Sequence, residues 1–399
     1  MEDKIEQIID SKTNKGVLED IKPTISALVL DQLGDSLFSI QFNAQKTGEP
    51  GFMLALEFIF QEINWIMIEQ WKTTPNSLLL NNLFFLFHPT FWNLPKLLKS
   101  VAHFKLAVLS TVSKLYWRIY RRKNENKSDN QLLDKPSSMM EAVVDRRVSY
   151  ALSTHLSTAS SLATAYQQFK EANYHLTMFT IAGHLTTTSA LTWTLYYLCK
   201  HETIKQKVQT EIDDFIEEAV PLNEILTNKS VLKYLDAVIR ESLRLAGAAA
   251  YLGRKATVDV QLPVSSNDSS DKKEFIIIPA GTNVSIMAQY MHYSERYYRN
   301  AKEFIPERWL PRDDDNDKEE METTDTTSCY FPFSAGNRAC FGEKYALLQM
   351  KVTLVAIGSK YNFTLAYPET ICKPSHFLAQ TPARFAAKFS RRRKAEKKD

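Results

Sequence analysis

The sequence predicts a mostly α-helical protein with a small β-sheet that forms late in the chain. Apolar residues recur at helical spacing in residues 21–44 and again in 51–72. The long stretch 141–201 contains no proline, the residue that most strongly interrupts a helix. Short runs of β-branched and apolar residues, which are typical of strands, appear only from Val258 onwards. The helices are therefore expected first and the few strands after them.

Further helices are expected in order along the chain. Residues 96–122 form a long candidate that ends in basic side chains, as helices often do, and the polar residues 124–135 indicate a loop after it. The stretch 141–201 is long enough for at least two helices. Two more helices are predicted at 204–219 and 232–245, where apolar residues again follow the helical period.

Three short strands are expected after the last of these helices, at residues 258–262, 275–278 and 284–288. The polar residues 265–273 between the first two indicate the end of a hairpin. The sequence Pro-Ala-Gly at 279–281 indicates the next turn.

Composition allows a large core, and length alone would allow two or three domains. The chain has 399 residues, of which 44% are hydrophobic, enough for a large core. We expect a single domain over residues 1–390 and a basic, disordered tail over 391–399. The net charge of +3 is too small to indicate a nucleic-acid partner. The four cysteines have the spacing of neither a disulfide framework nor a zinc site, so we expect reduced thiols.

The sequence has no clear signal for crossing a membrane. Residues 1–10 are charged and lack the apolar run of a secretory signal. The most apolar stretch, 73–95, is interrupted by prolines and polar side chains, which argues against a spanning helix. Its centre, from Leu83 to Phe87, is interpreted as core. A patch that dips into a membrane surface is the second interpretation.

A ten-residue segment at 333–342, F-S-A-G-N-R-A-C-F-G, combines side chains with distinct chemical uses. Gly336 permits the positive φ of a tight loop. Arg338 offers donors in a fixed geometry that suits a carboxylate. Cys340 stands just before a predicted helix at 343–357, and a helix N-terminus stabilises a thiolate. A buried cysteine in an ordinary turn is the alternative.

This segment matches the pattern F-x-x-G-x-R-x-C-x-G at every fixed position, and it resembles the haem-binding loop of the cytochrome P450 superfamily. The resemblance implies a haem-thiolate monooxygenase of the eukaryotic microsomal or fungal kind, with haem b as cofactor. Cys340 is then the axial ligand of the haem iron, where a thiolate favours O–O cleavage. By the same resemblance, Phe333, Gly336 and Gly342 shape the cofactor-binding loop, and Arg338 binds a haem propionate.

A second motif lies in the long helical stretch, where Gly183 interrupts a run of helix formers at a cost of roughly 1 kcal/mol. Threonines beside it can bond the carbonyl four residues earlier and bend the helix, so we expect a local widening. The sequence A-G-H-L-T-T at 182–187 resembles the superfamily's oxygen-activation motif A-G-x-[DE]-T-[TS]. The resemblance assigns catalytic roles to Gly183, Thr186 and Thr187, with Thr186 supporting dioxygen activation. Leu185 stands where the family usually has an acid.

Charged residues elsewhere support the same resemblance. Glu241 and Arg244 form E-x-x-R on one face of a predicted helix, a spacing worth only about 0.2–0.5 kcal/mol by itself. The sequence P-E-R-W at 306–309 resembles the family's P-E-R-F segment, which implies that Arg308 joins the pair in a buried ion triad. Arg254 corresponds to a family arginine that pairs with a haem propionate. A surface arginine is the alternative.

By the resemblance, the fold is a cytochrome P450 fold lacking its N-terminal part, with a substrate pocket lined by residues 246–251 and 377–385. The implied partners are NADPH–cytochrome P450 reductase and a small apolar substrate. The implied location is the endoplasmic reticulum membrane, although no transmembrane anchor is found in the sequence.

Two functions compete for this chain. One is a working monooxygenase that hydroxylates an apolar substrate with dioxygen and reductase-supplied electrons. The other is a non-catalytic or partial remnant with weak or no haem binding. The cysteine segment, the ion triad and Thr186 favour the first function. Leu185 and the expected lack of the N-terminal part favour the second.

Overall fold

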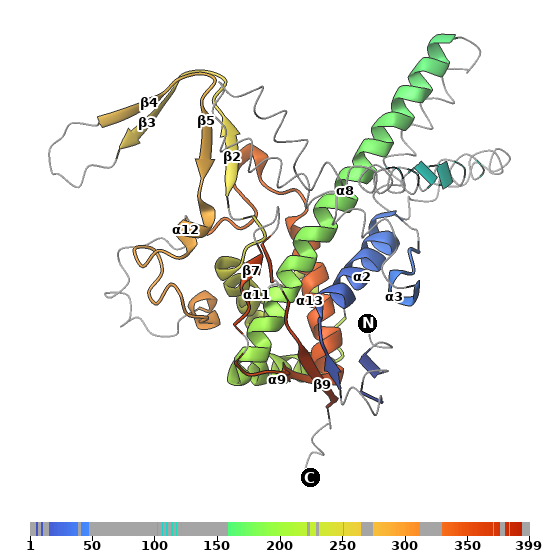
Figure 1. The fold of residues 1–399 in the computed structure, drawn as a ribbon, viewed down its shortest axis with the longest axis vertical. Coiled ribbons are helices and arrows are strands. Elements are labelled where there is room, and N and C mark those ends of the chain that lie inside the picture. The colour runs from blue at the N-terminus through green and yellow to red at the C-terminus, as the bar shows by residue number, and fades with distance from the viewer. Residues whose placement is uncertain are drawn as a thin grey trace, which may run out of the picture.

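The computed structural model describes residues 5–6, 9–10, 16–38, 41–47, 159–221, 224–228, 231–249, 251–264, 274–311, 329–369, 371–375, 380–382 and 384–392, with single positions between 102 and 121. Within these ranges the chain is mainly helical, and most of its short strands follow the central helices in sequence (Figure 1). The predicted class, mostly α with a small amount of β-structure, is confirmed.

The longest element is α8 (Ala159–Lys200), a helix of 42 residues that crosses the middle of the molecule (Figure 1). It packs against α2 (Lys22–Leu33), α11 (Lys233–Leu245) and α13 (Glu343–Lys360). The sequence predicts at least two helices within 141–201, whereas the described part of that stretch is one continuous helix.

Helix α11 begins where a carboxylate from α9 (Glu202–Glu217) meets its first turn. The two oxygens of Glu211 accept hydrogen bonds from the backbone amides of Tyr234 and Leu235 at 2.8 and 2.9 Å. Amides in a first turn have no partner inside their own helix, and a negative charge is favourable there. This contact fixes α11 relative to α9 and so positions the charged side chains of α11.

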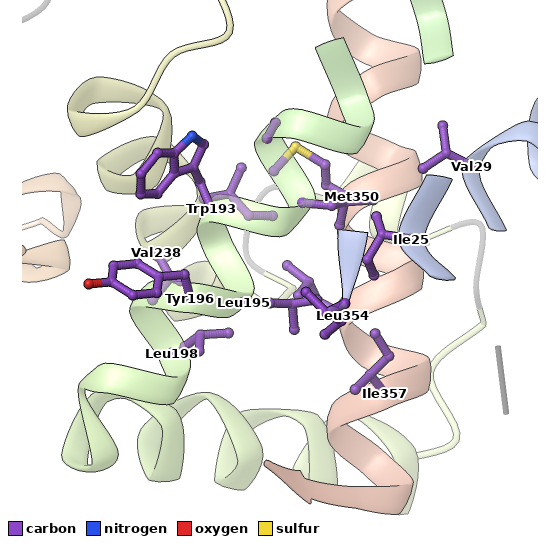
Figure 2. Close-up of a cluster of buried hydrophobic side chains, with 14 of the residues drawn as sticks. Ile25, Val29, Trp193, Leu195, Tyr196, Leu198, Val238, Met350, Leu354 and Ile357 are labelled. Atoms are coloured by element: carbon purple, nitrogen blue, oxygen red, sulfur yellow. The ribbon is translucent and has the colours of Figure 1, made fainter. Parts of the chain in front are cut away.

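The core lies where α2, α8, α11 and α13 meet. Figure 2 shows side chains from these helices pointing toward one another across the space between them. Full burial of one such side chain stabilises the fold by roughly 1.5–3 kcal/mol. The labelled members are buried residues of one cluster: Ile25, Val29, Trp193, Leu195, Tyr196, Leu198, Val238, Met350, Leu354 and Ile357.

The described strands form one three-stranded and three two-stranded antiparallel sheets. In the larger sheet, β9 (Ala387–Arg391) lies between β1 (Val17–Leu18) and β6 (Tyr361–Leu365), with Phe389 opposite Phe363. Figure 1 shows two of the ribbons, β2–β5 and β3–β4, on the side of α8 away from α2. The ribbons pair β2 (Leu252–Lys255) with β5 (Asn283–Ile286), β3 (Val260–Val264) with β4 (Glu274–Ile278), and β7 (Pro374–Ser375) with β8 (Thr381–Pro382).

Most predicted elements in the described ranges are present. The three predicted strands correspond to β3, β4 and β5, and the helices predicted at 204–219, 232–245 and 343–357 correspond to α9, α11 and α13. The other strands and the short helices α10 (Glu224–Thr227) and α12 (Ala288–His292) are not predicted from the sequence. Segments of two to five residues carry too few positions for a periodic pattern.

Helix α2 ends earlier than the predicted 21–44. The α-helix ends at Leu33, and a π-helical turn follows over Gly34–Phe38. A separate short helix, α3 (Ala44–Thr47), comes after this turn. Asp31 explains the separate start, because its carboxylate accepts hydrogen bonds from the first two amides of α3 at 2.7 and 3.0 Å.

Several predictions fall on residues outside the described ones. These are the helix at 51–72, the loop at 124–135 and the apolar run from Leu83 to Phe87. The described positions between 102 and 121 are helical, in agreement with the helix predicted at 96–122. None of the helices in the described ranges is long and apolar enough to span a membrane.

The tail predicted to be disordered begins at Arg391, but the first two of its residues are held in the fold. Arg391 is the last residue of β9 and forms ion pairs with Glu6 and Asp10. Arg392 binds Asp213 on α9, with Nη2 at 2.6 Å from the carboxylate. The expectation of disorder is therefore wrong for these two residues, because carboxylates distant in sequence hold them. Residues 393–399 lie outside the described ranges.

Candidate functional site

Cys340 stands in a tight segment, residues 333–342, which we call the Cys loop. The amide of Cys340 donates a hydrogen bond to the carbonyl of Phe333 at 2.8 Å, and the amide of Ser334 donates to Phe331 at 3.0 Å. Ser334 and Gly336 have φ angles of +65° and +71°, in the left-handed region that glycine adopts without steric cost. The loop is thus closed by its own backbone.

Helix α13 begins directly after the Cys loop. The carbonyl of Gly342 accepts the amide of Ala346 at 2.9 Å, and Glu343 is the first helical residue. Cys340 is a free, exposed thiol beside this helix N-terminus. A Cβ at position 342 would lie 3.7 Å from the sulfur of Cys340, which is an ordinary contact. Close packing within the described residues therefore does not explain the glycine at 342.

The two arginines predicted to bind haem propionates both lie at the Cys loop. Arg338 is exposed and ends the 3-10 helix η6 (Gly336–Arg338) inside the loop. Arg254, on β2, is also exposed and donates from Nη2 to the hydroxyl of Ser334 at 3.1 Å. The structure thus brings Arg254 to the loop from a distant part of the sequence.

Helix α8 meets the Cys loop through an aromatic contact, with the ring centroids of Phe179 and Phe341 5.3 Å apart. Phe341 nevertheless remains 75% exposed. Thr186 is also exposed, and its hydroxyl donates to the carbonyl of Ala182 at 2.6 Å. Thr187 is buried. The structure therefore separates the two threonines that the sequence analysis groups together.

Gly183 lies at the contact between α8 and α2. A Cβ on it would lie 2.9 Å from Cδ2 of the buried Leu33, closer than real Cβ atoms approach other groups. The predicted bond from threonine to the fourth preceding carbonyl is present, for example from Thr180 to Leu176 at 2.8 Å. However, α8 runs through the segment as an unbroken α-helix, so the predicted local widening is not found. The glycine lets the two helices approach.

Glu241, Arg244 and Arg308 meet in one cluster. The carboxylate of Glu241 accepts hydrogen bonds from Arg244 at 2.8 and 2.9 Å and from Nε of Arg308 at 3.1 Å. The side chains of Glu241 and Arg244 are completely buried, and Arg308 is 10% exposed. The amide of Ile305 and the indole of Trp309 add donors at 3.0 and 2.9 Å. Five donors thus satisfy the hydrogen-bonding capacity of a carboxylate that has no access to water.

Arg244 also connects the cluster to the Cys loop. Its Nη1 donates to the carbonyls of His292 and Ala301, both at 2.6 Å. Nε2 of His292 in turn accepts the amide of Phe331, two residues before the loop, at 3.4 Å. Burial and the nearby Arg244 charge lower the pKa of His292 to about 4, so the ring is neutral and can accept. His292 is not predicted from the sequence, because its role depends on contacts that no local motif marks.

The residues at the Cys loop fit a haem. An exposed thiol beside a helix N-terminus is a suitable ligand for iron. Exposed guanidinium groups at Arg254 and Arg338 suit propionates, and the exposed ring of Phe341 suits an apolar macrocycle. A Cβ at Gly336 would meet no atom within 4 Å, so the described residues leave that side of the loop open.

Comparisons with known proteins show the family of the chain. The family model described as Cytochrome P450 matches residues 1–389. The chain is 28% identical over 345 residues to cytochrome P450 4c21 of Blattella germanica, covering 86% of this chain and 60% of that protein. It is 32% identical over 187 residues to cytochrome P450 3A5 of Homo sapiens, covering 47% of this chain and 33% of that protein.

Among solved structures, the haem domain of cytochrome P450DA has a similar fold. It matches with a TM-score of 0.63 and 19% sequence identity, over 94% of this chain and 68% of that chain. The aligned part of the chain thus spans 60% or less of the two curated relatives named above. With a family model that covers nearly its whole length, this chain belongs to the cytochrome P450 family.

Proposed function

We propose that the protein is a haem-thiolate monooxygenase with Cys340 as the axial ligand of haem b. It would use dioxygen and electrons from NADPH–cytochrome P450 reductase to hydroxylate a small apolar substrate. The observation that carries the proposal is the free, exposed thiol of Cys340 beside the start of α13, on a residue whose backbone amide is held by the Phe333 carbonyl. When bound, the haem supplies the oxygen activation, which an axial thiolate favours.

The Cys loop and β2 would hold the cofactor's charged edge. Arg254 and Arg338 present exposed guanidinium groups, whose planar donors match a carboxylate. The contact between Arg254 and Ser334 orients one of them in advance, which lowers the ordering cost of binding. Phe333 and Gly336 serve the loop's shape: the first closes it through its carbonyl, and the second adopts a positive φ.

Thr186 is the residue of α8 that we assign to proton handling. Its exposed hydroxyl holds its proton toward the Ala182 carbonyl at 2.6 Å and would give that bond up to act on a substrate. The buried Thr187 and the glycine at 183 would act only through the position of the helix. Leu185 carries no proton, so this chain lacks an acid beside Thr186 in sequence.

Two segments are proposed to line the substrate pocket, residues 246–251 and 377–385. The amide of Gln380 donates to the carbonyl of Ala248 at 2.9 Å, so the two segments lie together. Ala246 is buried and Tyr251 is exposed, so the first segment runs from the core to the surface. Their apolar side chains are the basis for assigning an apolar substrate.

The proposed location is the endoplasmic reticulum membrane, where the reductase would supply electrons. This part of the proposal rests on resemblance to eukaryotic members of the family. Contact of the membrane with the run from Leu83 to Phe87 remains a prediction.

A second candidate function, a non-catalytic P450-like remnant with weak or no haem binding, is favoured by one residue. Leu185 occupies the position at which the family's motif has an acid, and leucine cannot transfer a proton. The two candidates differ in a simple way, since only the first requires turnover.

The test is expression of the chain with haem supplied, followed by reconstitution with reductase, NADPH and a panel of apolar substrates. Oxygen-dependent hydroxylation that Cys340→Ala abolishes would support the monooxygenase. Haem binding without product, in the presence of active reductase, would support the remnant and contradict the proposal.

A further inference from the structure

Trp309 is the residue of the ion cluster that the sequence motif does not assign. It ends the 3-10 helix η4 (Pro306–Trp309), at the position where the related motif has phenylalanine. Its indole Nε1 donates to Oε2 of Glu241 at 2.9 Å, a hydrogen bond that a phenylalanine ring cannot form.

The two oxygens of Glu241 are not equally supplied with donors. Oε1 accepts from Arg244, Arg308 and the amide of Ile305. Oε2 accepts from Arg244 and Trp309 alone among the described residues. Loss of the indole donor would leave this oxygen of a fully buried carboxylate with a single partner, which is costly in a medium without water.

The ring of Trp309 also packs toward the Cys loop. The rings of Trp309 and Tyr330 have centroids 4.6 Å apart, and the hydroxyl of Tyr330 donates to the carbonyl of Arg240 on α11 at 3.2 Å. Tyr330 is followed directly by Phe331, whose carbonyl accepts the amide of Ser334. The ring of Trp309 therefore packs against the residue that introduces the loop.

We propose that Trp309 is a positioning residue for the Cys loop: its N–H fixes Glu241, and its ring holds Tyr330 and the backbone that leads to Cys340. The loop geometry follows from this path, because the amide of Cys340 is held by Phe333, three residues after Tyr330. The functional consequence rests on the proposed role of Cys340 as haem ligand, whereas the loop order itself does not.

The variants that test this separate the hydrogen bond from the ring. Trp309→Phe keeps an aromatic ring and removes the donor. Trp309→His keeps the donor, because Nε2 of imidazole takes the place in the five-membered ring that Nε1 takes in indole. Trp193→Phe is a matched control: Trp193 is a buried tryptophan on α8 whose Nε1 donates to the Gln380 carbonyl at 2.8 Å, in a different part of the fold.

The measurement is amide hydrogen exchange of the peptide over residues 329–342 in the purified 399-residue chain without added haem. We expect Trp309→Phe to speed exchange there by about tenfold, which corresponds to about 1.4 kcal/mol of lost local stability. Trp309→His keeps the donor but loses the six-membered ring, so it should restore part of the protection, and Trp193→Phe should leave the exchange of this peptide unchanged. Equal exchange in Trp309→Phe and wild type would overturn the proposal.

If Trp309→Phe does not fold, Trp309→His decides: a folded variant with a partly protected loop supports the proposal, and a folded variant with an unprotected loop contradicts it. A second readout adds haem and records the reduced carbon monoxide spectrum, where Trp309→Phe should lower the fraction with a thiolate-type band. Failure of the wild type to bind haem would overturn the proposed function, while the exchange result would still decide the role of Trp309.

Discussion

Arg254 on β2 donates a hydrogen bond to the side chain of Ser334 in the Cys loop, although 80 residues separate the two in sequence. The bond places an exposed guanidinium group at the edge of the loop that carries Cys340. A strand that the sequence analysis does not predict therefore contributes to the candidate site.

Replacement of Arg254 by leucine should weaken haem binding by roughly tenfold or more, because a hydrogen bond to a charged group contributes about 1.5–3 kcal/mol. The measurement is a spectroscopic titration of haem into the haem-free protein. Lys255→Leu is the control, since its side chain points to the opposite face of the strand. Equal weakening in both variants would show a general effect of charge and contradict the specific role of Arg254.

Glu241→Gln should destabilise the protein by about 3–5 kcal/mol, because it leaves Arg244 and Arg308 as buried charges without a counter-charge. The free energy of unfolding from urea denaturation measures the effect. The neighbouring pair of Arg240 and Asp236 is the control: Arg240 is 47% exposed, and Arg240→Gln should cost no more than about 1 kcal/mol. If the two substitutions lowered the free energy of unfolding by comparable amounts, burial would not be the reason that the Glu241 cluster stabilises the fold.

His184 should make the fold sensitive to mild acid. It is buried between α8 and α2, with Nε2 3.0 Å from the hydroxyl of Ser26. Burial lowers its pKa from 6.5 to about 4, with a smaller contribution from Lys22. Between these two pH values the unfolded chain binds a proton that the folded chain does not, so stability falls as pH falls from 6.5 to 4.

Between pH 7 and pH 5 this residue alone should remove about 2 kcal/mol from the free energy of unfolding. His184→Gln has no titrating group at this position, so its loss over the same range should be smaller by about that amount. Urea denaturation of both proteins at the two pH values measures the difference. Identical pH dependence of the unfolding free energy in the two proteins would contradict a lowered pKa for His184.

Leu185 should make turnover inefficient. Without an acid at this position, most of the NADPH consumed should not lead to product. Leu185→Glu should raise the product formed per NADPH by about tenfold, below the full effect of a well-placed general acid. Leu185→Gln, similar in size but without an acidic proton, is the control. A wild type that already forms nearly one product molecule per NADPH would contradict this prediction.

The parts of the fold that the sequence predicts are those with a local cause. The helical character of residues 159–200 follows from a stretch free of proline, although the sequence does not predict that it is one continuous helix, and Cys340, Gly336 and Arg338 lie together because a continuous motif contains them. The meeting of Glu241, Arg244 and Arg308 follows only from the family resemblance, because nothing in their spacing shows that the triad is buried.

Other features depend on contacts between distant segments, which local patterns do not encode. Gly183 reads as a point of widening until the opposing side chain of Leu33 is known. His292 and Trp309 gain their roles from a guanidinium group, an amide and a carboxylate supplied by other elements. The same holds for Arg391 and Arg392, which read as a free basic tail in sequence but pair with acidic residues in the fold.

The most direct test of the account is the reduced carbon monoxide spectrum of the haem-loaded protein, recorded for the wild type and for Cys340→Ala. Ligation of the iron by the Cys340 thiolate predicts a thiolate-type band in the wild type and its complete loss in the variant. A wild type that takes up no haem, or a variant that keeps the band, would contradict it.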